Sequence, residues 1–543
     1  MNVHELPIVL DRASELPLAA QLATALRRAI LDGILRHDEA LPSTRTLASS
    51  VRVSRGTVVA AYDQLAGEGY LLARPGSATR VMVERPDTLT GAVVGSRGPL
   101  SSDVARISVP HPSAAGAVGP GATRRSAPRQ VPAANQRRAP GDRTQDTPAP
   151  HLTHPAMIDL APGHPSTQGL VDPAWTAAWR SAVAASGRSD SPPPSGTLEL
   201  RTSIADHVRR ARGLACRAED VIVTAGTSDA LASIGLALAT LVGEHQPHPA
   251  PRIAVEDPGY PTARRVLRRV GAHLQPVRTD ENGIDLTALA ALAPAPHAVL
   301  VTPSHQYPLG SSLSVQARLD LLEWARASGA AVIEDDYDSE FRFGTSPLPA
   351  LATLDTSGRV ALVGSFSKTV TPWIRCGYIV ATGDLGAALN EVRNDLGPSV
   401  SGVQQAALAH YLGSGGLARN VTRVRREYAH RRALVIGALG ALPGVRLSGL
   451  DGGLHVVVHL SPATEAGTTG TDVSALVAHA AAHGVRVAPL ADYAVVDRGQ
   501  QGLVLGYGAP TDLELGRALE VLAQLLTHPA RHHPHPAREF TCA

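Results

Sequence analysis

The stretch from Pro86 to Pro155 divides this chain of 543 residues into two parts with different patterns. It is rich in proline, alanine, glycine, serine and arginine, and it contains few large apolar residues. Because such a composition cannot bury enough apolar surface to fold alone, we expect a disordered linker over residues 86–155. The chain also exceeds the length of a single ordinary core, so we expect a domain on each side of this linker.

The flanking sequence predicts a small domain over residues 1–85 and a large domain over residues 156–527. In the large part, short apolar runs alternate with helical patterns, which is typical of an α/β sheet domain. Residues 528–543 are rich in histidine and proline, so we expect a disordered tail, although its histidines could bind metal adventitiously. The linker arginines could touch DNA phosphate, but a solvated tether fits the composition better.

The overall charge is nearly balanced, at a formal net charge of +2, so any nucleic-acid binding has to come from a local patch. Cys216, Cys376 and Cys542 lie far apart, and their spacing matches neither a disulfide framework nor a zinc site. No apolar run reaches the length of a membrane span, and the first residues lack the charged and apolar regions of a signal peptide. We therefore expect a cytoplasmic protein that binds no membrane and holds no metal.

The small domain carries a pattern of three short helices. Leucine or isoleucine recurs at four-residue spacing within residues 18–30, which predicts an amphipathic first helix. Ser43 or Thr44 can cap a second helix, and Ser54 can cap a third. Two short helices joined by a tight turn predict a helix-turn-helix, whose second helix enters the major groove of DNA. Residues 69–81 then predict a strand, a turn and a second strand, which together form a wing.

Polar side chains of these helices and of the wing are candidates for DNA contact. Arg45 and Arg55 can each donate two hydrogen bonds to guanine, so we expect them to contact bases. Hydroxyl and amide groups at the start of the third helix suit phosphate, and the wing arginines suit phosphate or the minor groove. The complete predicted set is Ser43, Arg45, Ser54, Arg55, Thr57, Arg74, Gly76 and Arg80. A helix-turn-helix pattern alone also occurs in small domains that bind no DNA.

Lys368 is the single lysine of a chain in which arginine is abundant. A guanidinium stays protonated, so arginine cannot act as the neutral amine nucleophile that a Schiff base requires. A lone lysine directly after a predicted strand and a Ser-x-Ser turn therefore indicates chemistry with an aldehyde, and pyridoxal 5′-phosphate (PLP) is the obvious one. The alternative is that an arginine-rich composition, typical of a GC-rich bacterial genome, left one lysine behind by chance.

Three further patterns are typical of a PLP site. The β-branched run over residues 221–225 ends in a small-residue turn that leads into a helix, which is the arrangement of a phosphate cradle. A second apolar run ends at Asp335, where a carboxylate could keep a pyridine nitrogen protonated. A metal site and a solvated acidic turn are competing interpretations of that carboxylate. Arg375 follows the lysine by seven residues and could bind phosphate with its guanidinium fork.

The two parts of the chain resemble two known families. The small domain, from the Leu-Pro-Ser-x-Arg box at residues 41–45 through residues 53–58 to the wing, resembles the GntR-type winged helix. The large domain, over residues 158–526, resembles the fold-type I aminotransferases in the order phosphate turn, Asp-x-Tyr, Ser-x-Ser-Lys, arginine. The combination is similar to the MocR family of transcription regulators. This resemblance implies a PLP cofactor, a homodimer that binds double-stranded DNA, and a PLP pocket that acts as the sensor.

The aminotransferase resemblance also implies a role for each matching residue. Lys368 would form the Schiff base with PLP, and Asp335 would contact the pyridine nitrogen. Tyr337 would hydrogen-bond the 3′-oxygen of the ring, and Tyr260 would stack on the ring. The residues implied to hold the phosphate are Gly226, Thr227, Ser228, Ser365, Ser367 and Arg375.

The chain departs from the aminotransferase pattern at three places. Tyr307 stands where these enzymes usually carry an asparagine, and Val504 stands where an arginine grips the carboxylate of an amino acid. Residues 191–196 lack the tyrosine that typically reaches the phosphate of the neighbouring subunit. Because a valine cannot bind a carboxylate, and burying an unpaired one is costly, these losses argue against efficient transamination.

We therefore expect PLP itself to be the effector, as in PdxR-like regulators of vitamin B6 synthesis. One alternative is a regulator that senses an amine or amino acid through a Schiff base with PLP. The other alternative is a working PLP-dependent aminotransferase that the small domain merely tethers to DNA. In that enzyme Arg264, Arg265 or Arg393 could supply the missing carboxylate contact from another direction.

Overall fold

The structure is a computed structural model of the whole chain. It describes residues 8, 10–12, 18–67, 70–72, 78–83, 157–187, 190–243, 250–343, 349–460, 472–496 and 499–527. The predicted linker and tail lie outside these described residues, as do Arg74 and Gly76 of the predicted wing.

The N-terminal domain is a winged helix-turn-helix, as the sequence predicts. Its elements are α1 (Leu18–Leu31), α2 (Thr44–Ser50), α3 (Arg55–Gly67), β1 (Leu71–Leu72) and β2 (Arg80–Val81). Ser43 caps α2 by accepting a hydrogen bond from the Thr46 amide, and Ser54 caps α3 by accepting one from the Thr57 amide at 3.1 Å. The three helices bury a common apolar core that includes Leu26. Strands β1 and β2 pair antiparallel and form the base of the wing.

The large domain is built on an eight-stranded sheet with the order β4-β11-β10-β9-β8-β5-β6-β7. The strands are β4 (Val221–Thr224), β5 (Arg252–Asp257), β6 (His273–Asp280), β7 (Gly283–Ile284), β8 (Ala298–Val301), β9 (Ala331–Asp336), β10 (Val360–Ser365) and β11 (Gly377–Val380). Strands β10, β9, β8, β5 and β6 run parallel, and β4 shares their direction because β11 is antiparallel to both β10 and β4. The carboxyl ends of these strands therefore lie at one edge, where open α/β sheets bind ligands.

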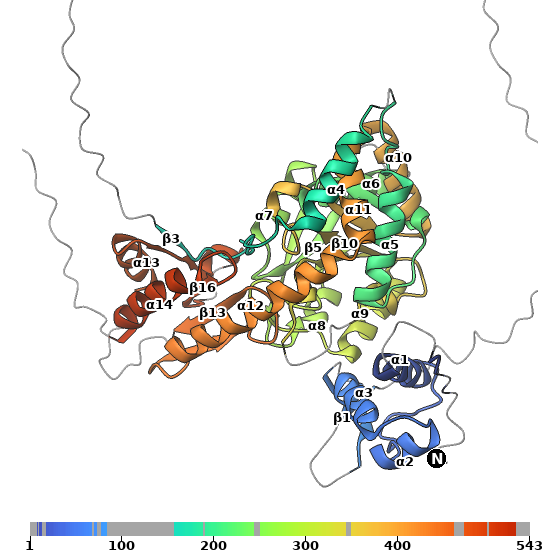
Figure 1. The fold of residues 1–543 in the computed structure, drawn as a ribbon, viewed down its shortest axis with the longest axis horizontal. Helices are drawn as coiled ribbons and strands as arrows, with labels where there is room; N and C mark the ends of the chain where they lie inside the picture. The colour runs from blue at the N-terminus through green and yellow to red at the C-terminus, as the bar shows by residue number, and fades with distance from the viewer. Residues whose placement is uncertain are drawn as a thin grey trace, which may run out of the picture. The chain divides into compact units, whose positions relative to one another are not determined.

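Helices cover both faces of this sheet, because successive residues of a strand point to opposite sides. In β4, Ile222 packs into a cluster with α6 (Thr227–Gly243) and α10 (Gly383–Leu396). Val221 and Val223 pack into a second cluster with α5 (Leu198–Arg212) and α11 (Gly402–Gly413). A third cluster joins the sheet to α8 (Leu286–Ala290) and α9 (Val315–Ser328). The helices of this part are α4 (Pro173–Ala184), α5 (Leu198–Arg212), α6 (Thr227–Gly243), α7 (Pro261–Arg269), α8 (Leu286–Ala290), α9 (Val315–Ser328), α10 (Gly383–Leu396) and α11 (Gly402–Gly413). In Figure 1, helices such as α5 and α6 lie beside the strands of the sheet.

The C-terminal part of the large domain has a second, four-stranded sheet with the order β12-β13-β16-β15. The elements of this C-terminal part are β12 (Val445–Ser448), β13 (His455–Leu460), α13 (Val473–Ala482), β14 (Val485–Arg486), β15 (Ala488–Pro489), β16 (Gly502–Gly506) and α14 (Asp512–Thr527). Strand β3 (Ile158–Asp159) pairs with β14, and the long helix α12 (Gly416–Leu439) contacts α11 as well as β12 and α14 (Figure 1). None of the helices in the described ranges has the length and apolar character that crossing a lipid bilayer requires.

Candidate functional site

Lys368 lies directly after β10, at the ligand-binding edge of the large sheet. Its half-buried amine donates a hydrogen bond to the backbone oxygen of Gly163. Burial lowers the pKa of Lys368 below its usual value, while the carboxylates of Asp338 and Asp335 act in the opposite direction. A lowered pKa increases the fraction of neutral amine, which is the form that attacks an aldehyde.

Asp335 and Asp336 are adjacent residues of β9, and their carboxylates have different hydrogen-bond partners. Asp335 pairs in register with Val363 of β10, so it lies beside the strand that carries the lysine. Its Oδ1 atom is buried and has no hydrogen-bond partner among the described residues. Asp336 points elsewhere and forms a buried ion pair with Arg212, at 2.6 Å between Oδ2 and Nε. The two carboxylates therefore have different roles, and only Asp335 has an oxygen free for a ligand.

The free carboxylate of Asp335 is costly to ionise while it lacks a partner. Burial, together with the nearby carboxylates of Asp336, Glu256 and Asp338, raises its pKa to about 7. A buried polar atom without a partner calls for a donor, and a protonated pyridine nitrogen is a donor of the required charge. This observation fits the predicted role of Asp335.

The predicted phosphate residues converge at the ends of three adjacent strands. Ser365 pairs with Gly377, and Gly377 pairs with Thr224, so the turn at Gly226 lies next to the end of β10. The backbone of Gly226 has a φ of 86°, which favours glycine, and a Cβ built there would lie 3.9 Å from Nη1 of Arg375. Helix α6 begins at Thr227, so its first amides, including that of Ser228, lie at this turn.

Two hydroxyl groups complete this cradle. The Ser365 hydroxyl donates to Ser367 Oγ at 2.9 Å, and Ser365 Oγ accepts a hydrogen bond from the Ser367 amide. A helix start, hydroxyl groups and one arginine form a site for a phosphate dianion. The structure thus brings together all six residues predicted to hold phosphate.

A cluster of aromatic rings forms another part of the site. Tyr307 lies in its middle, with ring centroids 5.6 Å from Tyr260, 5.4 Å from Tyr337, 5.2 Å from His455 and 5.5 Å from Tyr493. The tyrosine that replaces the expected asparagine therefore packs edge-on against its neighbours, and it brings the predicted ring-contacting tyrosines into one cluster.

The sequence did not identify four residues at this site: Gly163, His305, Asp338 and His455. Gly163 accepts the hydrogen bond from Lys368, and Asp338 is the carboxylate with the strongest influence on that lysine. His305 Nδ1 lies 2.9 Å from Asp338 Oδ2 and 2.9 Å from the Tyr337 hydroxyl. The signal in the sequence was the position of Asp338 directly after Tyr337, but an acidic turn would look the same.

The side chains of His305, Asp338 and His455 offer ligand atoms within 4.8 Å of one another, a spacing that could also hold a metal ion. However, His305 and Asp338 hydrogen-bond each other, and His455 Nε2 lies 3.0 Å from the backbone oxygen of Pro308. We therefore assign the three side chains to hydrogen bonding.

Val504 is fully buried in β16, in an apolar cluster with Val457, Leu490 and Tyr493. Of the three arginines considered as substitutes, Arg264 donates to the backbone oxygens of Gly259 and Tyr493. Likewise, Arg393 is buried and paired with Asp229. Arg265 is exposed and donates to Thr262, so it is the member of this trio whose guanidinium lies at the surface.

In the N-terminal domain, Ser43, Arg45, Ser54 and Arg55 are all exposed, and Thr57 is half-buried. Nε of Arg55 donates to Thr44 at 3.3 Å, which holds the start of α3 against α2. The guanidinium of Arg80 is paired with Asp38, at 3.3 Å between Nη1 and Oδ2. The predicted contacts of α2 and α3 thus share an exposed surface, whereas Arg80 already has an acidic partner.

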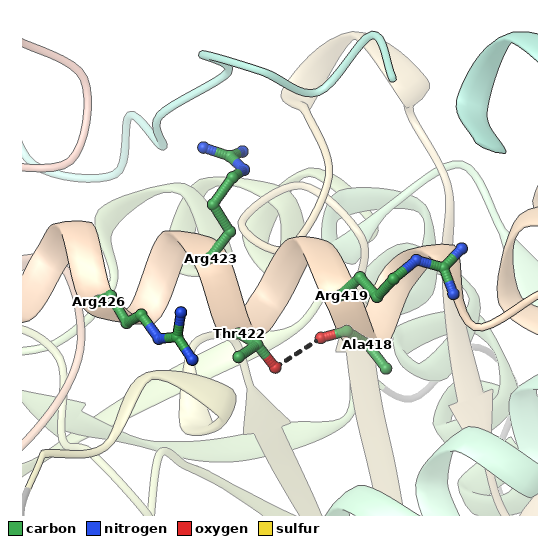
Figure 2. Close-up of a pocket in the computed structure, with 5 residues that line it drawn as sticks. All are labelled: Ala418, Arg419, Thr422, Arg423 and Arg426. Carbon is green, nitrogen blue, oxygen red and sulfur yellow. Dashed lines mark hydrogen bonds between the residues drawn. The ribbon is translucent and has the colours of Figure 1, made fainter. Parts of the chain in front are cut away.

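A hollow of about 510 Å³ lies on the exposed face of α12. It is lined by Ala418, Arg419, Thr422, Arg423 and Arg426. Figure 2 shows that the three guanidinium groups point in different directions, and Arg423 is engaged by Glu427. Because the cations do not converge, and no lining residue belongs to the cluster around Lys368, we do not assign the hollow to the site.

Comparisons with known proteins agree with both parts of this description. The family model described as aminotransferase class I and II matches residues 155–500, and the model described as bacterial regulatory proteins, gntR family, matches residues 18–81. Among solved structures, a kynurenine aminotransferase of Pyrococcus horikoshii superposes with a TM-score of 0.61 at 21% identity. That match covers 69% of this chain and 92% of the enzyme, and it shows the fold.

Curated relatives match almost the whole chain. The HTH-type pyridoxine biosynthesis transcriptional regulator PdxR of Corynebacterium glutamicum is 37% identical over 508 residues, which covers 93% of this chain and 95% of the relative. The probable rhizopine catabolism regulatory protein MocR of Rhizobium meliloti is 32% identical over 504 residues, which covers 92% of each chain. The chain therefore belongs to the MocR family of transcription regulators, in which a GntR-type winged helix is fused to a PLP-binding domain of the aminotransferase class I and II fold.

Proposed function

We propose that this regulator binds double-stranded DNA through its winged helix, and that PLP held at Lys368 changes this binding. The observation that supports this proposal is a contrast between two regions of the large domain. The side chains that would hold PLP lie together, whereas Val504 occupies the position of the carboxylate-binding arginine in an apolar core. Such a site could bind the cofactor although it lacks the usual arginine for the carboxylate of an amino acid.

The residues around Lys368 fit PLP. The cofactor supplies an aldehyde that condenses with an amine and a pyridine ring that withdraws electrons when protonated. Lys368 would hold the aldehyde carbon, and Asp335, with its unpartnered Oδ1, would hold the pyridine nitrogen. The remaining residues would orient the ring and bind the phosphate: Gly226, Thr227, Ser228, Tyr260, Tyr337, Ser365, Ser367 and Arg375.

We further propose that PLP is the physiological effector and that genes of PLP synthesis are among the targets. The relative from Corynebacterium glutamicum is named as a regulator of pyridoxine biosynthesis, and its match covers nearly all of both chains. Buried Arg264 donates to the backbone oxygen of Tyr493, and buried Arg393 is paired with Asp229. These two arginines are therefore poor candidates for binding the carboxylate of an α-amino acid.

The experiment is fluorescence anisotropy of a DNA fragment from upstream of the protein's own gene, at one stated salt concentration. Apo protein, PLP-loaded protein and the Lys368→Ala variant are compared. We expect a PLP-dependent change in DNA affinity that is lost in the variant. DNA binding that is indifferent to PLP but responds to an amino acid would refute PLP as the effector.

A second candidate function is the sensing of an amine or amino acid, and the exposed Arg265 favours it. Its guanidinium lies close enough to Tyr260, the proposed ring-stacking residue, to lower the pKa of that tyrosine, although burial outweighs this effect. An amino-acid screen monitored by the absorbance of bound PLP tests this function. A spectral change that Arg265→Ala abolishes, without release of a keto acid, would support sensing, whereas sustained keto-acid release would indicate an aminotransferase.

We also propose a homodimer. Trp373 follows Lys368 closely in the chain and is 93% exposed, and Val171 and Leu198 are further exposed apolar side chains of the large domain. Large exposed apolar side chains mark interaction surfaces when they group together. Sedimentation of the wild type and of Trp373→Glu tests this proposal. A dimer that the substitution weakens is expected, and a wild-type monomer at micromolar concentration would contradict it.

A further inference from the structure

Glu256 is a buried carboxyl group at the ligand-binding edge of the large sheet, and the proposed PLP site does not use it. Its side chain is 6% exposed and lies near the carboxyl end of β5. Strand β8 separates β5 from β9, the strand of Asp335. Thr302 directly follows β8, so Glu256, Thr302 and Asp335 come from three adjacent strands and lie at the same edge.

The hydrogen bonds of Glu256 converge on one of its two oxygens. Oε2 accepts from the Thr302 hydroxyl at 2.6 Å, from the Thr302 amide at 3.2 Å and from the side-chain amide of Gln306 at 3.3 Å. Oε1 is buried and has no hydrogen-bond partner among the described residues. Glu256 therefore holds the loop that follows β8, over residues 302–309.

The direction of the hydrogen bonds through Thr302 follows from the types of the groups. The backbone amide of Tyr307 can only donate, and it donates to Thr302 Oγ1 at 3.0 Å. The single proton of the Thr302 hydroxyl is therefore left for the carboxylate of Glu256, which accepts it. This chain of two hydrogen bonds fixes the backbone from which the Tyr307 side chain projects.

The side chain of Tyr307 contacts both tyrosines that we propose to contact the PLP ring. Its ring centroid lies 5.6 Å from that of Tyr260 and 5.4 Å from that of Tyr337, edge-on in each case. Gln306 supports the same backbone, because its side-chain amide donates to the Tyr307 oxygen at 2.8 Å and to the Pro258 oxygen at 3.0 Å. A shift of this loop would therefore move the ring that packs against both tyrosines.

We infer that Glu256 positions the tyrosines of the proposed PLP site, and that it acts through Thr302 and Tyr307. Glu256 and Thr302 are positioning residues, because each acts on PLP through another side chain. This role of Glu256 rests on the proposed PLP site and adds to it the residues that hold its aromatic cluster in place.

An effect of the Glu256 charge on PLP would have the opposite sign. Burial raises the pKa of Glu256 to about 7, and the hydrogen bonds from Thr302 act in the opposite direction. Loss of the Thr302 hydroxyl therefore favours the neutral acid, which no longer raises the pKa of Asp335. Ionised Asp335 would then be favoured, and PLP would bind more tightly through its pyridinium nitrogen. Weaker binding after loss of the hydroxyl thus indicates positioning.

The test is a fluorescence titration of the full-length protein with PLP, in the wild type, Thr302→Val and Thr302→Ser. Valine keeps the shape of threonine but breaks the chain of hydrogen bonds, so we expect PLP affinity to fall by about 3- to 10-fold, the effect of one hydrogen bond. Serine keeps the hydroxyl and should restore the wild-type affinity. Unchanged or tighter binding in the valine variant, or a loss that serine does not restore, would overturn the role of Glu256.

Tyr307→Ala provides the second arm. A general loss of structure would lower PLP affinity in any background, whereas positioning requires the side chain that is positioned. We therefore expect Thr302→Val to have little further effect on PLP affinity in the Tyr307→Ala protein, so that the two substitutions are not additive. The same fold-loss from Thr302→Val in both backgrounds would rule out action through Tyr307.

Two controls keep the outcomes apart. Thr279→Val removes the hydroxyl of another buried threonine, 3% exposed in β6, and should leave PLP affinity unchanged. If urea denaturation shows that Thr302→Val does not fold, Thr302→Ala removes the same hydroxyl and replaces it in both backgrounds. A wild type that binds no PLP would refute the proposed function itself. Normal PLP binding that loss of the Thr302 hydroxyl leaves unchanged would refute the role of Glu256 and nothing else.

Discussion

The strand ends around Lys368 and the region around Val504, both in the aminotransferase-like domain, carry different kinds of side chain. At the ends of β4, β9 and β10, a lysine, a carboxylate with an unpartnered oxygen and the proposed phosphate cradle lie together. On β16, Val504 is buried among apolar side chains where a carboxylate-binding arginine would be needed for an amino-acid substrate. Under our proposal, the contrast teaches that this fold can hold PLP without the usual arginine for a substrate carboxylate, as a PLP sensor requires.

The largest expected effect comes from replacing the lysine. Lys368→Arg keeps the positive charge but removes the only amine side chain able to bond the aldehyde. We expect the absorption band of bound PLP to disappear, and PLP to be lost on dialysis, to the same extent as in Lys368→Ala. Retention of the band in either variant would mean that PLP binds somewhere else in the chain.

Restoring an arginine on the substrate side should damage the fold. Val504→Arg places a charge in the apolar cluster with Leu490, and we expect a loss of roughly 3 kcal/mol or more in the free energy of unfolding. The matched control is Val495→Arg, at a partly exposed valine, which should change stability by about 0.5 kcal/mol or less. Urea denaturation measures both. A stable Val504→Arg protein that gained transaminase activity would show that this region is a dormant substrate site.

Substitution of the two aspartates of β9 should affect different properties, PLP affinity for Asp335 and stability for Asp336. Asp335→Ala removes the partner of the pyridine nitrogen, and we expect PLP affinity to fall by about 10- to 100-fold, the value of a charged hydrogen bond. Asp336→Ala removes the carboxylate that forms an ion pair with buried Arg212, so its main effect should be on stability. Fluorescence titration with PLP and urea denaturation distinguish the two outcomes. Equal effects of both variants on PLP affinity would contradict the assignment of Asp335.

The smallest expected effect is a pH dependence of stability in the PLP-free protein. Burial raises the pKa of Asp335 and of Glu256 to about 7, so the folded protein holds protons that the unfolded chain releases near pH 4. Stability from these groups is therefore full below about pH 4 and falls as pH rises to about 7. Asp335→Asn should flatten this decline, and so should bound PLP, whose pyridinium charge favours the carboxylate. An identical decline in wild type and variant would mean that Asp335 does not titrate in this range.

Much of the site could be predicted from the sequence because it lies on contiguous motifs. Asp335 lies at the carboxyl end of β9, and Lys368 and the turn at Gly226 follow β10 and β4. Parallel strands deliver such residues to one edge of the sheet. The winged helix was predictable for a similar reason, since its caps, such as Ser54, and its helix spacing are local features.

The residues that the sequence did not identify depend on contacts between distant segments. Gly163 reaches Lys368 from the start of the large domain, and His455 arrives from the second sheet. Asp338 stands beside a recognised motif, yet only the hydrogen bond from His305 distinguishes it from a solvated acid. Likewise, the sequence could not show that Arg264 donates to backbone oxygens, because Tyr493 lies next to it only in the folded chain.

The most direct test of the account is the affinity for PLP with and without saturating operator DNA. Coupling between two sites is reciprocal, so DNA must change PLP affinity by the same factor by which PLP changes DNA affinity. We predict such a matching change in the wild type, measured by fluorescence titration with PLP at constant salt. Equal PLP affinity on and off DNA would contradict the central claim, because PLP would then occupy the Lys368 site without influencing the winged helix.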